Sequence, residues 1–171
     1  MMEEEIKLFS ININGSNSQI KRKQILNKLT KQNVDIICLQ EVHIQKQHRK
    51  YLDYPKLGVL FTALADQKKR GVAIYVKNKI NEKKIYADEQ GRILMIQINL
   101  HQKQLLLVGM YAADDNQKKF YNRLYDKIIS VSEENICLIG DFNAIVDVKK
   151  DYVSTEQIRK KKKENSTKNF L

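Results

Sequence analysis

Asp141 and Asn143 come directly after an apolar run, residues 136–139, in the sequence Gly-Asp-Phe-Asn. A short apolar run that follows polar residues predicts a buried strand. Loops at strand ends on a rigid scaffold often carry binding and catalytic side chains. A carboxylate and an amide in such a loop supply a base and a neutral hydrogen-bond donor, which are groups that hydrolytic chemistry uses.

Three other apolar runs end on polar side chains in the same way. Asn and Asp are common in turns because of their backbone geometry, so each strand end taken alone also has this simpler interpretation. Four such ends in one chain predict a shared site. The other polar residues are Asn12 and Asn14 after Ile11, Glu41 after residues 36–39, and Tyr111 after residues 105–110.

This set of groups suits cleavage of a phosphodiester bond. That reaction requires an oriented water, a base and a cation that spreads the negative charge of the transferred group. Amides and a phenol can hydrogen-bond a phosphate without pairing permanently with the carboxylates, as Lys or Arg would. The chain has 31 Lys and Arg against 20 Asp and Glu, a formal net charge of +11. This excess favours a polyanionic partner, nucleic acid before an acidic membrane surface.

The elements that would position these groups alternate between strands and helices. Asn14-Gly15 is also a hairpin signal, but a stretch with rough helical periodicity follows it, not an alternating strand. Ser16 and Gln19 are spaced as a capping box for that helix. The pattern predicts an α/β domain with a mixed sheet. The first expected strand ends at residue 12, and the others cover 34–39, 58–64, 71–76, 92–100, 104–111 and 136–139. The expected helices cover about 20–29, 43–54 and 117–131.

Two basic segments add to the charge. The triplet Lys21, Arg22 and Lys23 begins the first predicted helix, and it is either a solvated helix face or a phosphate contact near the helix N-terminus. Residues 151–171 are rich in Lys and Asn and have no periodic apolar pattern, so we expect a disordered basic tail. Residues 159–163 within it are either a solvated charge run or a nuclear-import or nucleic-acid patch.

Cysteine and histidine spacing argues against a structural zinc site. Cys38 and Cys137 lie inside apolar strand runs, without a Cys-x-x-Cys motif, and both are expected to be reduced core residues. His43 and His48 are five positions apart, which does not suit a shared metal, and both are expected at the surface.

The acidic N-terminus does not resemble a leader, and no apolar run approaches the roughly 18 residues of a bilayer span. We expect an intracellular protein, with the nucleus favoured, no membrane partner and a monomeric state.

The strand-end motifs together resemble a known superfamily. They are Asn12-Ile13-Asn14-Gly15, Leu39-Gln40-Glu41, Gly71-Val72-Ala73-Ile74, Gly91-Arg92, Tyr111-Ala112 and Gly140-Asp141-Phe142-Asn143. Their order is similar to that of the endonuclease/exonuclease/phosphatase superfamily, which includes exonuclease III. Within it, Ile20, Lys21 and Arg22 after the Asn-Gly turn look most like the apurinic-type endonuclease domain of non-long-terminal-repeat retrotransposons. The resemblance implies a DNase I-like two-sheet α/β sandwich with mixed sheets over residues 1–150.

The resemblance also implies roles in the hydrolysis of DNA with Mg²⁺, for which Mn²⁺ could substitute. Glu41 would hold the metal, with Asn14 beside it. Asp141 would orient or deprotonate the attacking water, and Asn143 would stabilise charge on the transferred phosphoryl group. Tyr111 would donate a hydrogen bond to a phosphate oxygen, and Asn12 would be a catalytic residue beside the metal. The residues that would contact nucleic acid are Lys21, Arg22, Lys23 and Arg70.

Several positions depart from the family pattern. The family closes its site with a Ser-Asp-His triplet near the C-terminus, and here no histidine follows Asp141. Val42 and Ala113 stand where the family usually has Thr and Pro, and Asn14 stands where its repair branch has an acidic residue. We therefore expect a C-terminally truncated domain that lacks the last strands and has weakened activity. The alternative is a catalytically inactive nucleic-acid-binding fragment or element remnant, and a phosphoinositide or sphingomyelin phosphodiesterase is a more remote one.

Overall fold

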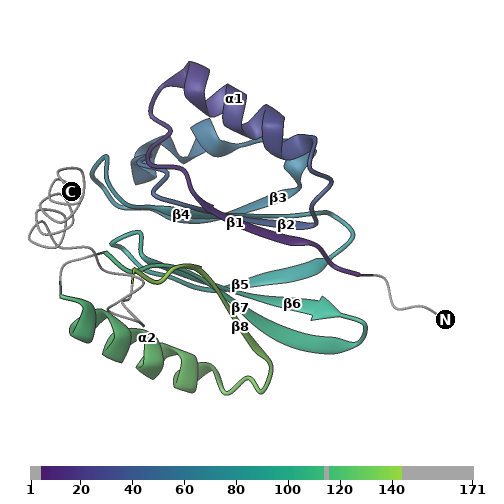
Figure 1. The fold of residues 1–171 in the computed structure, drawn as a ribbon. Helices are drawn as coiled ribbons and strands as arrows, with labels where there is room; N and C mark the ends of the chain where they lie inside the picture. The colour runs from purple at the N-terminus through teal and green to yellow at the C-terminus, as the bar shows by residue number, and fades with distance from the viewer. Residues whose placement is uncertain (1–4, 114–115, 144–171) are drawn as a thin grey trace, which may run out of the picture.

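The computed structural model describes residues 5–113 and 116–143, and it contains two four-stranded β-sheets packed face to face. Figure 1 shows helix α1 on the outer face of one sheet and helix α2 on the outer face of the other. The predicted two-sheet α/β sandwich with mixed sheets is therefore confirmed. The tail that we expected over residues 151–171 lies outside the described residues.

The first sheet has the strand order β1-β2-β4-β3. Strands β1 and β2 run parallel because α1 carries the chain back between them, whereas β4 pairs antiparallel with both β2 and β3. The strand–turn–helix interpretation of the Asn14-Gly15 region is thus confirmed against the hairpin. The bounds are β1 Leu8–Asn12, α1 Gln19–Thr30, β2 Ile36–Gln40, β3 Val59–Ala63 and β4 Val72–Val76.

The second sheet has the order β5-β6-β7-β8. Strands β7 and β8 run parallel with α2 between them, and β5, β6 and β7 pair antiparallel. Each sheet therefore contains one strand–helix–strand unit, and parallel strands place their carboxyl ends at the same edge. The bounds are β5 Asn81–Ala87, β6 Ile93–Leu100, β7 Lys103–Tyr111, α2 Gln117–Val131 and β8 Ile136–Asp141.

The space between the sheets is filled by apolar side chains of the central strands. Residues of β2 and β4 are buried along their whole lengths, because one face of that sheet packs on the other sheet and the opposite face packs on α1 and the segment after β2. This burial on both faces explains why β2 and β4 appear as continuous apolar runs in the sequence. The core between the sheets includes Cys38, Ile74, Leu94, Ile96 and Leu107.

Four local expectations were wrong. The predicted helix at 43–54 is two short 3-10 helices, η1 Lys46–Leu52 and η2 Pro55–Leu57. Strand β5 was not predicted at all. Ser18 rather than Ser16 caps α1, because the buried Ser16 hydroxyl donates instead to the Val42 carbonyl at 2.8 Å. Cys38 is buried as predicted, but Cys137 is only partly buried, because β8 lies at the edge of the second sheet among the described residues.

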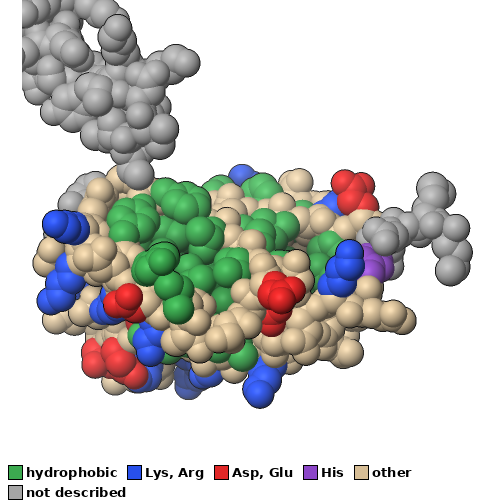
Figure 2. Space-filling view, turned by 90° about the horizontal axis from the view of Figure 1, so that it is seen from below, with side chains coloured by type: hydrophobic (Ala, Val, Ile, Leu, Met, Phe, Trp, Pro, Cys, Tyr) green, Lys and Arg blue, Asp and Glu red, His purple; other side chains and the backbone are tan. Residues whose placement is uncertain are grey.

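The outer face of β8 carries exposed apolar side chains. Alternate residues of β8, such as Ile139, point into the core between the sheets, so Ile136 and Leu138 face the side on which α2 packs. Both are about 40% exposed. Figure 2, which views this side of the molecule, shows apolar side chains gathered on it.

Neither α1 nor α2, nor any other helix among the described residues, combines the length and apolarity that crossing a bilayer requires.

Candidate active site

The polar strand ends meet at one rim of the sandwich. In the first sheet Asn12 pairs in register with Gln40, the residue before Glu41, and in the second sheet Tyr111 pairs with Asp141. Backbone hydrogen bonds connect the loops along this rim, so their relative positions are fixed. These bonds run from Gly15 N to Glu41 O, Val42 N to Gly71 O, Gly71 N to Gly91 O, Tyr111 N to Arg92 O and Ala112 N to Asp141 O, over 2.6–3.3 Å.

One side-chain hydrogen bond joins the two sheets at the rim. The Asn12 Nδ2 amide donates to Asp141 Oδ2 at 3.0 Å, between residues 129 positions apart in the sequence. The Asn143 backbone amide donates to Asp141 Oδ1 at 3.0 Å, so both carboxylate oxygens are held. Asn12 is itself oriented, because its Oδ1 accepts from the Asn14 backbone amide at 2.9 Å. Of the five residues that we expected to gather, namely Asn12, Glu41, Tyr111, Asp141 and Asn143, the structure thus joins Asn12 and Asp141 through their side chains, and Asn143 contacts Asp141 through its backbone.

Helix α2 supports the loop that carries Asn143. The Gln117 Nε2 amide donates to the Asn143 carbonyl at 2.6 Å, and the Tyr121 hydroxyl donates to the Phe142 carbonyl. Burial, together with the negative charge of Asp141, raises the pKa of the Tyr121 phenol, so this donor keeps its proton. The sequence did not reveal these two supports, because the helical pattern of α2 says nothing about which loop lies beside it.

Glu41 and His43 form a second part of the rim. The His43 Nε2 atom lies 3.4 Å from Glu41 Oε2, and the Glu41 side chain is only 18% exposed. A Cβ atom on Gly15 would lie 2.7 Å from His43 Nδ1, so the glycine leaves room for the imidazole. His43 was expected at the surface and is instead partly buried beside Glu41. The i, i+2 spacing of the two residues in a tight loop is the signal that could have identified it.

Several residues at this rim have a positive backbone φ angle, which residues other than glycine rarely adopt. Glu41 has φ +53°, His43 +55°, Asn14 +46°, Asn143 +45° and Arg70 +58°. Asn and His tolerate this left-handed region better than most residues, but Glu does not. Such strain costs on the order of 1–3 kcal/mol per residue and clusters at functional sites, where the surrounding structure enforces it. Five other described residues, Asn33, His101, Gln102, Asn116 and Ser132, also have φ between +47° and +66°, so this conformation by itself does not distinguish the rim.

The basic triplet at the start of α1 partly braces the rim. Lys21 Nζ donates to the carbonyls of Ile13 and Asn14 at 3.1 and 3.0 Å. Arg22 donates to the Ser16 carbonyl at 2.8 Å and lies over the Tyr51 ring. These two cations therefore hold the loop that follows Asn12, a role that neither sequence interpretation included.

The other two cations that we expected to contact nucleic acid have different surroundings. Lys23 is exposed. Arg70 lies next to the rim, because its carbonyl accepts from the His43 backbone amide at 2.9 Å, and its side chain lines a cavity together with Arg92 and Lys119.

The donor set around Glu41 fits a hard divalent cation. No group of three or more His, Cys, Asp and Glu side chains suited to a metal occurs among the residues that the structure describes. Mg²⁺ does not require such a cage, because it commonly binds one or two carboxylates and keeps several waters and phosphate oxygens as ligands. Glu41 supplies one such carboxylate, and Asn14 precedes Gly15, whose backbone amide donates to the Glu41 carbonyl at 2.6 Å.

The two packed mixed sheets, with a helix on the outer face of each, form a DNase I-like α/β sandwich. The sequence profile of the Endonuclease/Exonuclease/phosphatase family matches residues 9–147, and the chain belongs to this family. The predicted relationship is therefore confirmed.

Solved structures of other proteins share the fold. The endonuclease domain of TRAS1, a telomere-specific non-LTR retrotransposon, is 14% identical with a TM-score of 0.63, over 82% of this chain and 60% of that one. The AP endonuclease LMAP from Leishmania major is 16% identical, with a TM-score of 0.64, over 90% and 60%. D. rerio TDP2 with a single-strand DNA product is 17% identical, with a TM-score of 0.58, over 84% and 62%. The chain thus spans about 60% of the length of these neighbours.

Proposed function

We propose that this chain hydrolyses phosphodiester bonds in DNA with the help of Mg²⁺, as an apurinic-type or retrotransposon-type endonuclease. The observation that carries the proposal is the Asn12–Asp141 hydrogen bond, because it joins strand ends of both sheets into one polar site. Asn12 pairs in register with Gln40, the residue before Glu41. Family membership supports phosphodiester chemistry. The similarity to a retrotransposon endonuclease domain and to AP endonucleases supports DNA as the substrate.

In the proposed mechanism, a water attacks the phosphorus and passes a proton to Asp141, while the bond from phosphorus to the leaving oxygen breaks and that oxygen takes a proton from solvent. The two carboxylate oxygens of Asp141 receive hydrogen bonds from the Asn12 side chain and the Asn143 backbone, and these bonds fix the direction in which the carboxylate presents its remaining lone pairs. The Asn143 side chain and the Tyr111 hydroxyl donate to phosphate oxygens and stabilise the charge that develops on them. Both donors are neutral, so they do not compete with the metal for the carboxylates.

Glu41 would hold the divalent cation, with Asn14 beside it. When bound, Mg²⁺ would neutralise negative charge on the phosphate and polarise its oxygens. His43, 3.4 Å from the Glu41 carboxylate, restricts the orientation of that carboxylate. Mn²⁺ would substitute, because it also accepts oxygen ligands.

The basic surface would attract the DNA backbone. The net charge of +11 supports this through counterion release and steering. Lys23 and Arg70 are proposed phosphate contacts, whereas Lys21 and Arg22 would act mainly by holding the rim loop in place. A nuclear location is proposed on the basis of the DNA substrate.

A second candidate function is binding of nucleic acid without cleavage. It is supported by the formal net charge of +11, because attraction to a phosphate backbone requires no catalytic group. The two functions differ in the measured product, since binding alone leaves a plasmid intact.

Nicking of supercoiled plasmid by pure protein separates these functions. We expect nicking with Mg²⁺ that stops when EDTA is added, and a loss of about 10²–10⁴-fold in the Asp141→Ala variant. Asp126→Ala is the matched control, because Asp126 is an exposed aspartate on α2. Nicking that persists in Asp141→Ala at the wild-type rate would refute the proposed site. Salt-sensitive binding without nicking would favour the second function.

A further inference from the structure

A cavity of about 210 Å³ lies beside the rim, and cationic side chains dominate its lining. It is lined by Arg70, Gln90, Arg92, Asn116, Lys119, Phe120 and Arg123. The four cations come from three separate parts of the chain, namely the loop before β4, the loop before β6, and α2. None of the described residues that line the cavity is acidic.

The cavity adjoins the candidate active site through Tyr111. The Tyr111 backbone amide donates to the Arg92 carbonyl at 2.8 Å, and Arg92 Nε lies 3.4 Å from the Tyr111 carbonyl. On the other side, Arg70 is bonded through its carbonyl to the His43 amide. Backbone hydrogen bonds therefore connect the loops that line the cavity to the loops of the rim.

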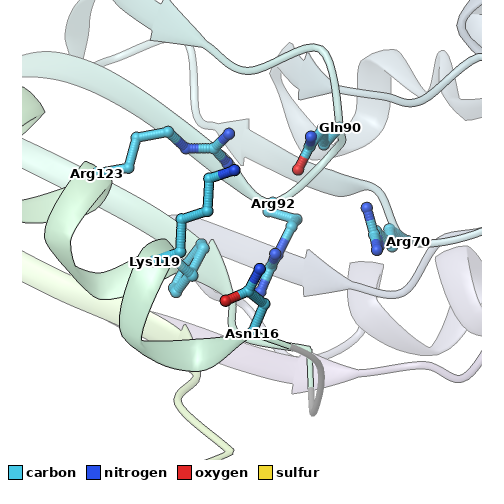
Figure 3. Close-up of a pocket in the computed structure, with 7 residues that line it drawn as sticks. Arg70, Gln90, Arg92, Asn116, Lys119 and Arg123 are labelled. Atoms are coloured by element: carbon cyan, nitrogen blue, oxygen red, sulfur yellow. The ribbon is translucent and has the colours of Figure 1, made fainter.

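Arg92 is held in place before any ligand arrives. Its guanidinium carbon lies 4.2 Å from the centroid of the Phe120 ring, and the residue is only 5% exposed. An arginine fixed by stacking and by a carbonyl loses little rotamer entropy when it binds an anion. Figure 3 shows the Arg92 side chain extending between Gln90 and Asn116 within the cavity.

Arg123 is only partly neutralised by protein groups. Its Nη2 lies 2.8 Å from Asp88 Oδ2, while Asp88 Oδ1 accepts from the backbone amides of Arg92 and Ile93. This one carboxylate thus serves several donors. The Arg123 Nε atom is buried and has no hydrogen-bond partner among the described residues, so the guanidinium is not saturated.

Lys119 adds a cation that no described carboxylate balances. It is exposed and makes no hydrogen bond or ion pair with another described residue, and Figure 3 shows its ammonium group directed toward the Arg123 guanidinium. Like charges that converge on one cavity repel each other, and a bound anion converts this repulsion into attraction. The guanidinium forks match the paired oxygens of a phosphate.

We propose that this cavity binds a phosphate group of a nucleic-acid strand whose scissile phosphate lies at the rim. The proposal rests on the proposed function, because it takes the substrate to be nucleic acid. The phosphate is either internal to the strand or terminal, and both present negatively charged non-bridging oxygens to Arg70, Arg92, Lys119 and Arg123. The cavity would then set the register of the strand relative to Asp141 and Glu41 without contributing to bond cleavage.

Binding measurements without divalent metal test the cavity separately from catalysis. Fluorescence anisotropy of a labelled DNA duplex in EDTA gives Kd as a function of salt for wild type, Lys119→Ala and Arg70→Gln. Each variant should weaken binding several-fold, and the slope of log Kd against log salt should fall by about 0.9 for each phosphate that the variant no longer neutralises. Lys118→Ala is the matched control, because Lys118 is the neighbouring lysine on α2 and does not line the cavity.

The two sources of phosphate are separated by comparing a hydroxyl-ended duplex with a 5′-phosphorylated one. An effect of Lys119→Ala on both duplexes indicates an internal phosphate, and an effect confined to the phosphorylated duplex indicates a terminal one. Equal slopes for Lys119→Ala and Lys118→Ala, or no binding of DNA by the wild type, would overturn the proposal. A selective effect of Lys119→Ala in a protein that does not nick plasmid would leave the cavity assigned and refute only the hydrolytic function.

Discussion

Substitution of Gly140 by Ala tests how the last described strand delivers Asp141 to the rim. Gly140 has φ +133°, a conformation that is almost confined to glycine. A Cβ atom at this position would overlap the carbonyl oxygen of Met110, its register partner in β7, far inside van der Waals contact. Backbone atoms of a paired strand cannot turn aside as a side chain can, so β8 must move away from β7.

The expected cost follows from these two effects. The strained φ costs an alanine about 1–3 kcal/mol, and the overlap with a fixed carbonyl costs about 1–3 kcal/mol more. The alanine also restricts the unfolded chain, which returns about 0.4–1 kcal/mol. We therefore predict that Gly140→Ala lowers the free energy of unfolding by about 1–6 kcal/mol. A displacement of Asp141 by about 1 Å would also reduce nicking on the order of 100-fold.

Urea denaturation followed by circular dichroism measures this change, with the slope of the transition as a check on two-state behaviour. Glu134→Ala is the control, because Glu134 is exposed just before β8, and it should change the free energy by less than about 0.5 kcal/mol. If Gly140→Ala unfolds within about 0.5 kcal/mol of the wild type, the backbone geometry assigned to the end of β8 is wrong.

Two further predictions concern buried titratable groups. Burial opposes ionisation of Asp35, but the Lys7 backbone amide at 2.9 Å and the Lys79 ammonium at 3.3 Å outweigh it and hold the pKa of this carboxyl below its usual 3.8. Asp35→Asn should therefore lower the free energy of unfolding by about 1–3 kcal/mol at pH 7. This difference between the variant and the wild type should disappear as the pH falls below about 4 and through the folded-state pKa of Asp35. An equal difference at pH 7 and pH 3 would contradict this. Burial raises the pKa of the Cys38 thiol to about 12. At pH 8 a thiol reagent should therefore modify at most Cys137 in the folded protein, and both cysteines in urea. Mass spectrometry maps the labelled cysteine, and rapid labelling of Cys38 without denaturant would count against the fold.

The strand ends could be predicted from the sequence because each combines two local signals. Apolar runs mark strands, and Asn12, Glu41, Tyr111 and Asp141 follow or end such strands with polar groups. The run at 136–139 was expected to be buried, but Ile136 and Leu138 of β8 are exposed. Their convergence also follows from local order, since a strand–helix–strand unit makes the two strands parallel and places their carboxyl ends together. The pairing of the two sheets at the rim required the structure, because the Asn12–Asp141 bond joins distant parts of the chain.

Strand β5 could not be predicted because it lacks the apolar pattern of a central strand. Its sequence Asn-Glu-Lys-Lys-Ile-Tyr-Ala is mostly charged and polar, and it forms the edge of the second sheet. Edge strands commonly carry lysines, which discourage pairing with other chains. Charge therefore conceals the strand from a search for apolar runs.

The surroundings of His43 and Arg92 depend on tertiary structure. His43 was judged only by its spacing from His48, whereas its actual neighbour is Glu41. Arg92 was noted only within the Gly-Arg motif, and its neighbours Lys119 and Arg123 lie on α2. Ser16 and Ser18 are equally suitable caps by residue type, and the buried hydrogen bond from Ser16 to Val42 decides between them.

A double-mutant cycle on the nicking rate tests the central claim most directly, namely that residues from both sheets act as one hydrolytic site. The rates of Asn12→Ala, Asp141→Ala and the double variant are compared with wild type in Mg²⁺. Because Asn12 acts through Asp141, the double variant should be about as slow as Asp141→Ala alone. Effects that multiply would show that the two residues act independently, and a wild type without Mg²⁺-dependent nicking would contradict the hydrolytic site itself.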